Sequence, residues 1–165
     1  MPLNAKSAQL QIRVSTQEKA AIRRSAKEAG LDISSYVLQC LLPPSRLRFQ
    51  DLCEACTAAS DASFALAELN GFLSRMAAGE LRDAVEPAPG TALTPFLANY
   101  ISAMVEAACE LHAIIPPRWT AAVPPLENPY FGSNLISLRL YLLSHSPPPF
   151  RRRNIFIDAG IGTRV

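Results

Sequence analysis

A short run of strictly alternating residues near the amino terminus constrains the fold of this chain more than any other feature. From residue 9 to residue 14, apolar side chains at even positions alternate with polar ones at odd positions. This period of two predicts a strand with one buried face. A lone strand cannot satisfy its own backbone N–H and C=O groups, and no second strand pattern lies nearby. We therefore predict that it pairs antiparallel with the same strand of a second copy, across a two-fold axis.

The polar face of this predicted two-stranded ribbon suggests what it contacts. In each copy it carries Gln9, Gln11 and Arg13. Gln can bridge an adenine edge and Arg a guanine edge in the DNA major groove, which is wide enough to admit such a ribbon. The alternative is a strand packed on another sheet, with Arg13 merely solvated.

The residues after the strand predict a first helix with clear ends. Ser15 and Glu18 have the reciprocal spacing of a capping box, and an apolar stripe at helical spacing follows. Gly30 predicts the end of this helix, because glycine adopts the left-handed conformation after a helix without a Cβ penalty.

A second short helix is predicted to begin with Ser34 as its N-cap and to end at Pro43 and Pro44. Its expected buried side consists of Ile33, Tyr36, Val37, Cys40 and Leu41. Free backbone N–H groups at Ser34 and Ser35 would then point outward beside the ribbon, where they could bind phosphate.

Residues 8–42 resemble the ribbon-helix-helix DNA-binding fold of the Arc/MetJ/CopG superfamily. The resemblance lies in the Gln9/Gln11/Arg13 face, the VSTQEKAAI helix start and the AGLDISSYV turn. It implies an intertwined homodimer, base readout by the three strand residues and phosphate anchoring at the start of the second helix. Lys6 and Arg46 are further candidate cations, and Asp32 stands where many relatives have Ser or Thr.

The formal charge of +2 hides a division along the chain. Residues 1–50 carry +5, residues 51–150 carry −6, and residues 151–165 carry +3. A basic amino-terminal piece joined to an acidic one suits a DNA-binding module with a protein-interaction domain. We divide the chain into a ribbon-helix-helix module, residues 1–44, and a helical partner-binding domain, residues 45–165.

Several classes of function find no support in the sequence. The polar start of the chain gives no signal peptide, and no apolar run reaches the ~18 residues of a membrane span, so we expect a cytoplasmic protein. Cys53 and Cys56 form a CxxC pair without a second ligand pair, which favours buried free thiols over a metal or redox site. Glu106 and Glu110 are better explained as solvated helix charges than as paired carboxylates. We expect no catalysis, metal or cofactor.

Residues 45–115 predict mainly helices, with a break near Ser60 and Asp61 and a linker at residues 86–90. The piece FALAELNGFLSRMAAGEL is similar to the helix that follows the ribbon-helix-helix of plasmid mobilisation accessory proteins. Residues 116–149 hold eight of the 14 prolines and predict a loop with aromatic anchors. A short helix at 135–143 and a short strand around Ile155 to Ile157 complete the mainly α fold.

The carboxy-terminal region, roughly residues 95–160, resembles small proteins encoded beside AbiEii-like nucleotidyltransferase toxins. The motifs are PRWT, L-x-x-P-[YF]-F and SPPPFRRRNIFID. The resemblance implies an antitoxin role and marks pattern positions as partner-binding candidates: Trp119, Pro129, Phe131, Phe150, Arg151, Arg153 and Asn154. From the residues alone, the aromatics could instead fill a core, and Arg151 to Arg153 could form a surface cluster.

The sequence is therefore interpreted as that of a type II antitoxin. Such a protein would bind double-stranded operator DNA as a homodimer and neutralise a toxin, possibly a nucleotidyltransferase, through residues beyond 45. Two alternatives stay open: a relaxosome accessory protein of plasmid mobilisation, and a dimeric adaptor that does not bind DNA.

Overall fold

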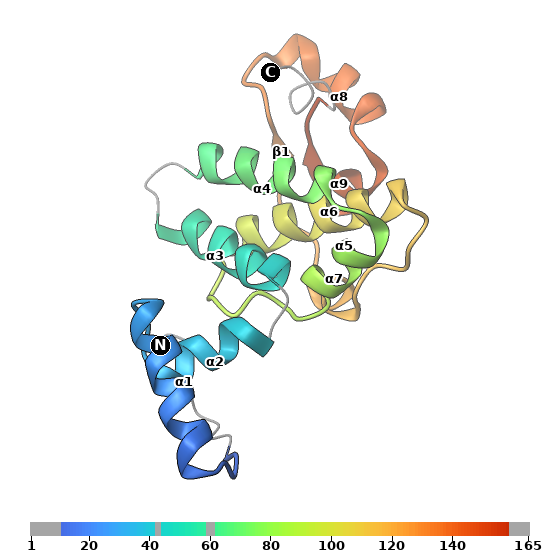
Figure 1. Ribbon diagram of the computed structural model, residues 1–165. Helices are drawn as coiled ribbons and strands as arrows, with labels where there is room; N and C mark the ends of the chain where they lie inside the picture. The colour runs from blue at the N-terminus through green and yellow to red at the C-terminus, as the bar shows by residue number, and fades with distance from the viewer. Residues whose placement is uncertain (1–10, 42–43, 59–61, 159–165) are drawn as a thin grey trace.

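The computed structural model describes residues 11–41, 44–58 and 62–158. This part of the chain is mainly helical, as predicted, with a small two-stranded sheet near its end (Figure 1). The elements are α1 (Thr16–Glu28), α2 (Ile33–Leu41), α3 (Pro44–Ala58), α4 (Ser63–Arg75), α5 (Ala78–Val85), α6 (Pro95–Leu111), α7 (Arg118–Ala122), β1 (Tyr130–Phe131), η1 (Ile136–Leu138), α8 (Arg139–His145), α9 (Pro148–Arg151) and β2 (Ile155–Phe156).

Helix α1 has the two ends that the sequence predicts. The Glu18 N–H donates to the Ser15 hydroxyl over 3.2 Å, and the Ser15 N–H donates to the Glu18 carboxylate over 2.7 Å, which completes the capping box. At the other end Gly30 has a φ of +69°, and the Leu31 N–H donates back to the Ala26 carbonyl over 2.9 Å. This is a Schellman motif, and it turns the chain into α2.

The predicted strand is not formed by the single chain. Residues 11–15 carry no regular secondary structure, and Ile12 and Val14 are 58% and 42% exposed. Gln9, the first residue of the alternation, lies outside the described residues. Because the prediction required a second copy to supply the partner strand, the ribbon stays a prediction.

Helices α3 to α6 form the core of the larger, carboxy-terminal part of the molecule. Helix α6 packs against α4, α5, α7 and α9 and is buried on most of its surface. Fully buried side chains from all four helices meet there, among them Phe49, Leu69, Leu81 and Ile101. The predicted break near Ser60 and Asp61 lies outside the described residues, and α4 begins after it at Ser63. A second break, between α4 and α5, was not predicted.

The two cysteines of the CxxC pair lie one turn apart on α3 and are buried in this core as free thiols, as predicted. Burial raises the pKa of the Cys53 thiol to about 12, and the neighbouring Cys56 adds to the rise. A thiol that stays protonated is a poor nucleophile and a poor metal ligand. The pair is therefore part of the packing.

The carboxy-terminal part closes over α6 with short elements. β1 and β2 pair in parallel, with Tyr130 opposite Ile155 and Phe131 opposite Phe156. This confirms the predicted strand and gives it a partner from the proline-rich loop. The predicted helix at 135–143 appears as η1 followed by α8, which extends to His145. No helix of the described residues is long and apolar enough to cross a membrane.

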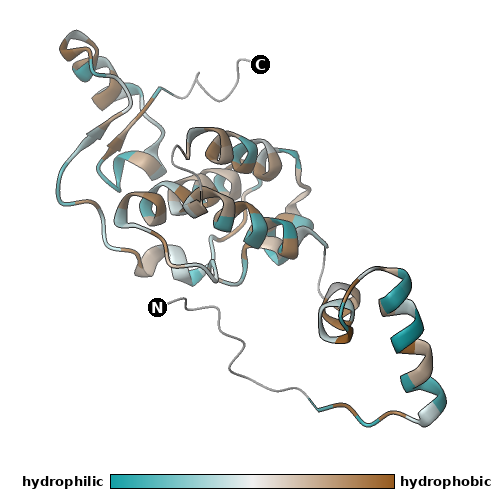
Figure 2. Ribbon diagram, turned by 90° about the vertical axis from the view of Figure 1, so that its left-hand side faces the viewer, coloured by the Kyte–Doolittle hydropathy of each residue, from teal (hydrophilic) through white to brown (hydrophobic). Residues whose placement is uncertain are grey.

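Figures 1 and 2 show how these parts are arranged in space. The α1–α2 pair lies at one end of the molecule, and α8 projects at the opposite end, with α3 to α6 between them.

Candidate nucleic-acid interface

The α1–α2 pair carries a row of exposed cations. On α1 these are Lys19, Arg23, Arg24 and Lys27, and Arg13 is exposed just before the helix. Gln11, which is predicted to contact bases together with Arg13, is also exposed. Gln9 and Lys6 lie outside the described residues. An exposed basic helix face beside a polar segment is the electrostatic footprint of a protein that binds the phosphate backbone.

The start of α2 differs from the prediction. The Asp32 carbonyl accepts the first helical hydrogen bond, from the Tyr36 N–H at 2.9 Å. Its carboxylate accepts the Ser34 N–H at 2.9 Å and the Ser35 N–H at 3.1 Å. The N-cap is therefore Asp32 and not Ser34, because a carboxylate two or three residues upstream satisfies these donors best.

This cap changes the expected phosphate site. The Ser35 hydroxyl also donates to Asp32, at 2.5 Å, so both N–H groups and one hydroxyl of the Ser34–Ser35 pair are already engaged. The Asp32 carboxylate places a negative charge at the position predicted to bind a phosphate. An aspartate two residues before the Ser-Ser pair is itself an N-cap signal, and the prediction of Ser34 as N-cap did not take it into account.

The same helical pair leaves much of its apolar surface uncovered. Tyr36 and Val37 of the expected buried side of α2 are half-buried, whereas Ile33, Cys40 and Leu41 are exposed. Leu41 is 64% exposed, and Ile12 and Val14 add to this surface. Figure 2 colours α2 mainly brown and α1 mainly teal, so the apolar residues of the pair are concentrated on α2. A small unit with this much open apolar surface is expected to bind another chain.

Arg46, suggested as a further DNA contact, lies on α3 and turns toward the helical body. Its Nε donates to the Asp83 carbonyl over 3.2 Å, which ties α3 to α5. This use of the guanidinium takes Arg46 away from the basic face of α1.

Two of the partner-binding candidates are buried in the carboxy-terminal part. Phe150 is 6% exposed and packs edge-on against Tyr100, with ring centroids 5.3 Å apart. Arg153 is 5% exposed. Neither side chain is available to a partner in this fold, so the expectation that they bind one is corrected.

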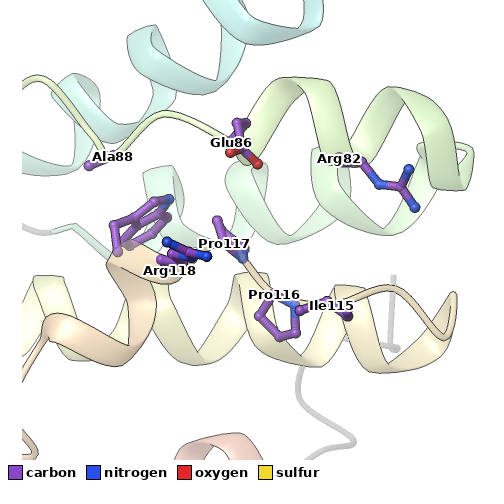
Figure 3. A pocket seen from close by; sticks show the side chains of 8 residues that line it. Arg82, Glu86, Ala88, Ile115, Pro116, Pro117 and Arg118 are labelled. Atoms are coloured by element: carbon purple, nitrogen blue, oxygen red, sulfur yellow. The ribbon is translucent and has the colours of Figure 1, made fainter.

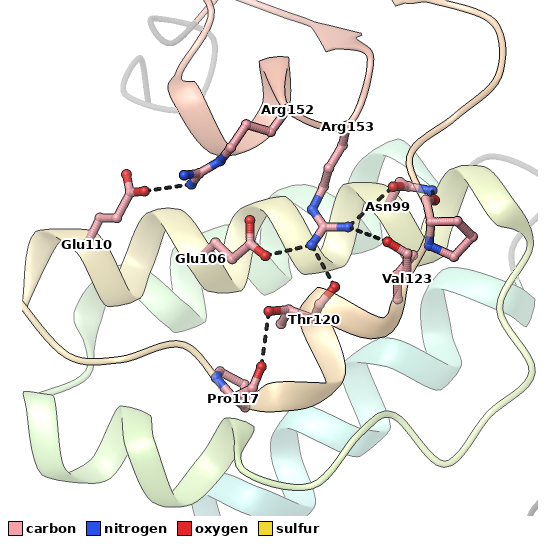
Figure 4. Close-up of polar contacts among 9 residues, drawn as sticks. Asn99, Glu106, Glu110, Pro117, Thr120, Val123, Arg152 and Arg153 are labelled. Carbon is pink, nitrogen blue, oxygen red and sulfur yellow. Dashed lines mark hydrogen bonds and ion pairs between the residues drawn. The ribbon is translucent and has the colours of Figure 1, made fainter.

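Arg153 is the centre of a buried polar network (Figure 4). Its guanidinium donates to the Glu106 carboxylate at 2.5 Å, to the Thr120 carbonyl at 2.7 Å and to the Asn99 side-chain oxygen at 3.3 Å. The network joins the end of the chain to α6 and α7. The sequence predicted that Glu106 is a solvated surface charge. This prediction is wrong, because Glu106 forms a buried ion pair with Arg153.

The remaining partner candidates have mainly structural contacts. The Trp119 indole N–H donates to the Val85 carbonyl over 2.8 Å. The Phe131 ring stacks on the Phe156 ring, with ring centroids 5.1 Å apart. The Asn154 amide donates to the Leu126 carbonyl over 2.9 Å, and its φ of 62° suits a tight turn. Arg151 and Pro129 are the exposed members of the set.

A shallow groove of about 560 Å³ lies beside Trp119 (Figure 3). Arg82 and Glu86 of the α5 region line one side, and residues 115–119 line the other. Its lining has charges of both signs and lacks a nucleophile beside a base, so no reaction follows from it. Within the described residues, no group of three or more His, Cys, Asp or Glu side chains could hold a metal ion.

The amino-terminal segment matches a known protein family. Residues 4–51 match the family model NikA-like, described as mobilization protein NikA. The match covers less than a third of the chain, and it includes α1, α2 and the first half of α3. This amino-terminal segment is thus similar to a DNA-binding family of the ribbon-helix-helix type. No curated protein and no solved structure matches the chain.

Proposed function

We propose that this chain is a homodimeric ribbon-helix-helix DNA-binding protein that acts as an accessory factor in plasmid mobilisation. The observation that carries the proposal is the match of residues 4–51 to the NikA-like mobilization family. The exposed cations of α1 and the uncovered apolar side of α2 support it, since the first suit DNA and the second suits a second copy.

In the proposed dimer, different residues would contact the bases and the phosphates of the DNA. Gln9, Gln11 and Arg13 of both copies would enter the major groove and read bases. The cations of α1 would bind the flanking phosphates, which gives affinity without sequence information. At the start of α2 the Ser34 hydroxyl is the remaining group for a phosphate contact, because Asp32 holds the neighbouring N–H donors.

An antitoxin is the second candidate function. Its specific support is the exposed apolar surface of η1 and α8, where a protein could dock, since Leu140 is 80% exposed. Its support is weaker than at the sequence level, because Phe150 and Arg153 of the matching motifs have structural roles. In this function the DNA site would be the operator of the chain's own gene.

The genomic location of the DNA sequence that the protein binds distinguishes these two functions. The full-length protein is incubated with sheared total DNA of its source cell, and the retained fragments are sequenced. Mobilisation predicts enrichment of a plasmid transfer origin beside a relaxase gene. An antitoxin predicts enrichment of the chain's own promoter, with a neighbouring gene that is toxic when expressed alone. Retention of no fragment at low salt would leave the dimeric adaptor and contradict the proposal.

A further inference from the structure

The helical segment η1–α8 has an outer side that is apolar. Ile136, Leu140 and Leu143 follow one another at steps of four and three residues, which places them on one face of the segment. They are 76%, 80% and 41% exposed, and Leu135 beside them is 61% exposed. We call these four residues the α8 face. A helix on the surface of a globular chain normally turns polar residues outward, so we expect a binding partner to cover the α8 face.

The α8 face is not the side of this segment that packs against the rest of the chain, because the opposite side of α8 already makes those contacts. Leu142 is 3% exposed. Directly after the helix, the Ser146 hydroxyl contacts the Leu142 carbonyl at 2.6 Å and the Ile157 carbonyl at 2.7 Å. These contacts fix α8 against the end of the chain and hold the α8 face outward. Figure 1 shows the segment projecting beyond the helical body.

The chemistry of the surface suits a second copy of itself. Between residues 135 and 144 the single charged side chain is Arg139, whose guanidinium carbon lies 4.9 Å from the centre of the Phe131 ring. A two-fold contact brings each group close to its own copy, and like charges would oppose such a contact. The α8 face itself has no charge to oppose it.

The size of the surface also fits. The α8 face together with half-exposed Leu138 and Tyr141 exposes on the order of 600 Å². That is the upper end of what monomers leave uncovered, and it approaches the ~800 Å² per partner of a stable interface. The α8 face lies at the opposite end of the molecule from α1 and α2 (Figure 2), so both ends can be covered at once.

We propose that the α8 face is a second self-association surface, through which one copy of the chain binds another independently of the amino-terminal ribbon. Combined with the proposed ribbon, it joins DNA-binding dimers into a higher assembly that can hold two DNA sites. The surface itself does not rest on the proposed function, whereas its consequence for DNA does.

Sedimentation equilibrium of the full chain without DNA tests this. Leu140→Glu places a charge on the α8 face without disturbing the core, because Leu140 is 80% exposed. Ile115→Glu is the matched control, since Ile115 is 90% exposed outside the α8 face. We expect the wild type to exceed a dimer and Leu140→Glu to have half its mass or less, with Ile115→Glu unchanged. A Leu140→Glu mass equal to that of the wild type overturns the proposal and leaves the face to a different protein.

A second variant separates this proposal from the ribbon. Ile33→Glu charges the exposed side of α2, and it should reduce the wild-type assembly to dimers held by the α8 face. The double variant, Ile33→Glu with Leu140→Glu, should be a monomer. If Ile33→Glu leaves the mass unchanged while Leu140→Glu lowers it, the proposed ribbon dimer is contradicted, whereas self-association through the α8 face is supported.

Discussion

The carboxylate of Asp32 accepts the backbone N–H of Ser34 over 2.9 Å, so the first donors of α2 are satisfied from within the chain. This relationship shifts the expected phosphate contacts from the start of α2 toward the cations of α1. In the proposed complex Asp32 would therefore lower the affinity for DNA, while its cap stabilises the helix.

The first prediction follows from that charge. Asp32→Ser keeps a capping oxygen but removes the negative charge. At about 4 Å in a water-like medium one such repulsion is worth ~1 kcal/mol, so DNA affinity should rise about fivefold at low salt. Fluorescence anisotropy with a DNA duplex measures it. Asp51→Ser, an exposed carboxylate on α3, is the control and should change nothing. Unchanged or weaker binding by Asp32→Ser would show that the carboxylate does not face a phosphate.

The second prediction concerns the buried ion pair. Glu106→Ala leaves the Arg153 guanidinium without its charged partner, and both side chains are almost fully buried, at 12% and 6% exposed. Loss of one half of a buried pair lowers the free energy of unfolding by about 3–5 kcal/mol. Glu110→Ala on the same helix breaks the exposed pair with Arg152, at 2.8 Å, and should cost less than ~1 kcal/mol. Equal losses in urea denaturation of the two variants would contradict the account of Arg153 as the centre of a buried network.

The third prediction is a loss of stability at alkaline pH. Burial raises the pKa of the Cys53 thiol to about 12 and that of Cys109 to about 11, from an ordinary value near 9. Above pH 9 the unfolded chain therefore releases protons that the folded chain retains, and stability falls as pH rises. Each thiol should contribute up to ~1.4 kcal/mol per pH unit. Urea titrations between pH 9 and about 11 measure the slope. The slope should be shallower for Cys53→Ala, and an equal slope would contradict this origin.

Local signals in the sequence predicted the amino-terminal helices well. The Ser15–Glu18 spacing and Gly30 determine the ends of α1 by contacts within a few residues, so both could be identified without a structure. The N-cap of α2 was misplaced by two residues because Asp32 and Ser34 are both good caps. The strand could not be tested in a single chain, since its hydrogen-bond partner belongs to a second copy.

The contacts of the carboxy-terminal part could not be predicted from the sequence. Arg153 and Glu106 are 47 residues apart, and no local pattern indicates that they meet. The arginine run at 151–153 looks uniform in the sequence, yet its members have three different environments. The α8 face could not be identified from the sequence either, because large apolar residues occupy seven of the nine positions of LISLRLYLL and the pattern does not show which of them point outward.

The central claim is that the amino-terminal segment binds DNA through its predicted ribbon, and one titration tests it most directly. Arg13→Ala is compared with the wild type on the selected DNA site and on a scrambled duplex, by fluorescence anisotropy over a range of salt. Arg118→Ala, remote from the ribbon, is the control. We predict that Arg13→Ala loses about 1–3 kcal/mol on the selected site and little on the scrambled one, because a base contact carries specificity. Equal affinities of Arg13→Ala and the wild type for the selected site would contradict the claim.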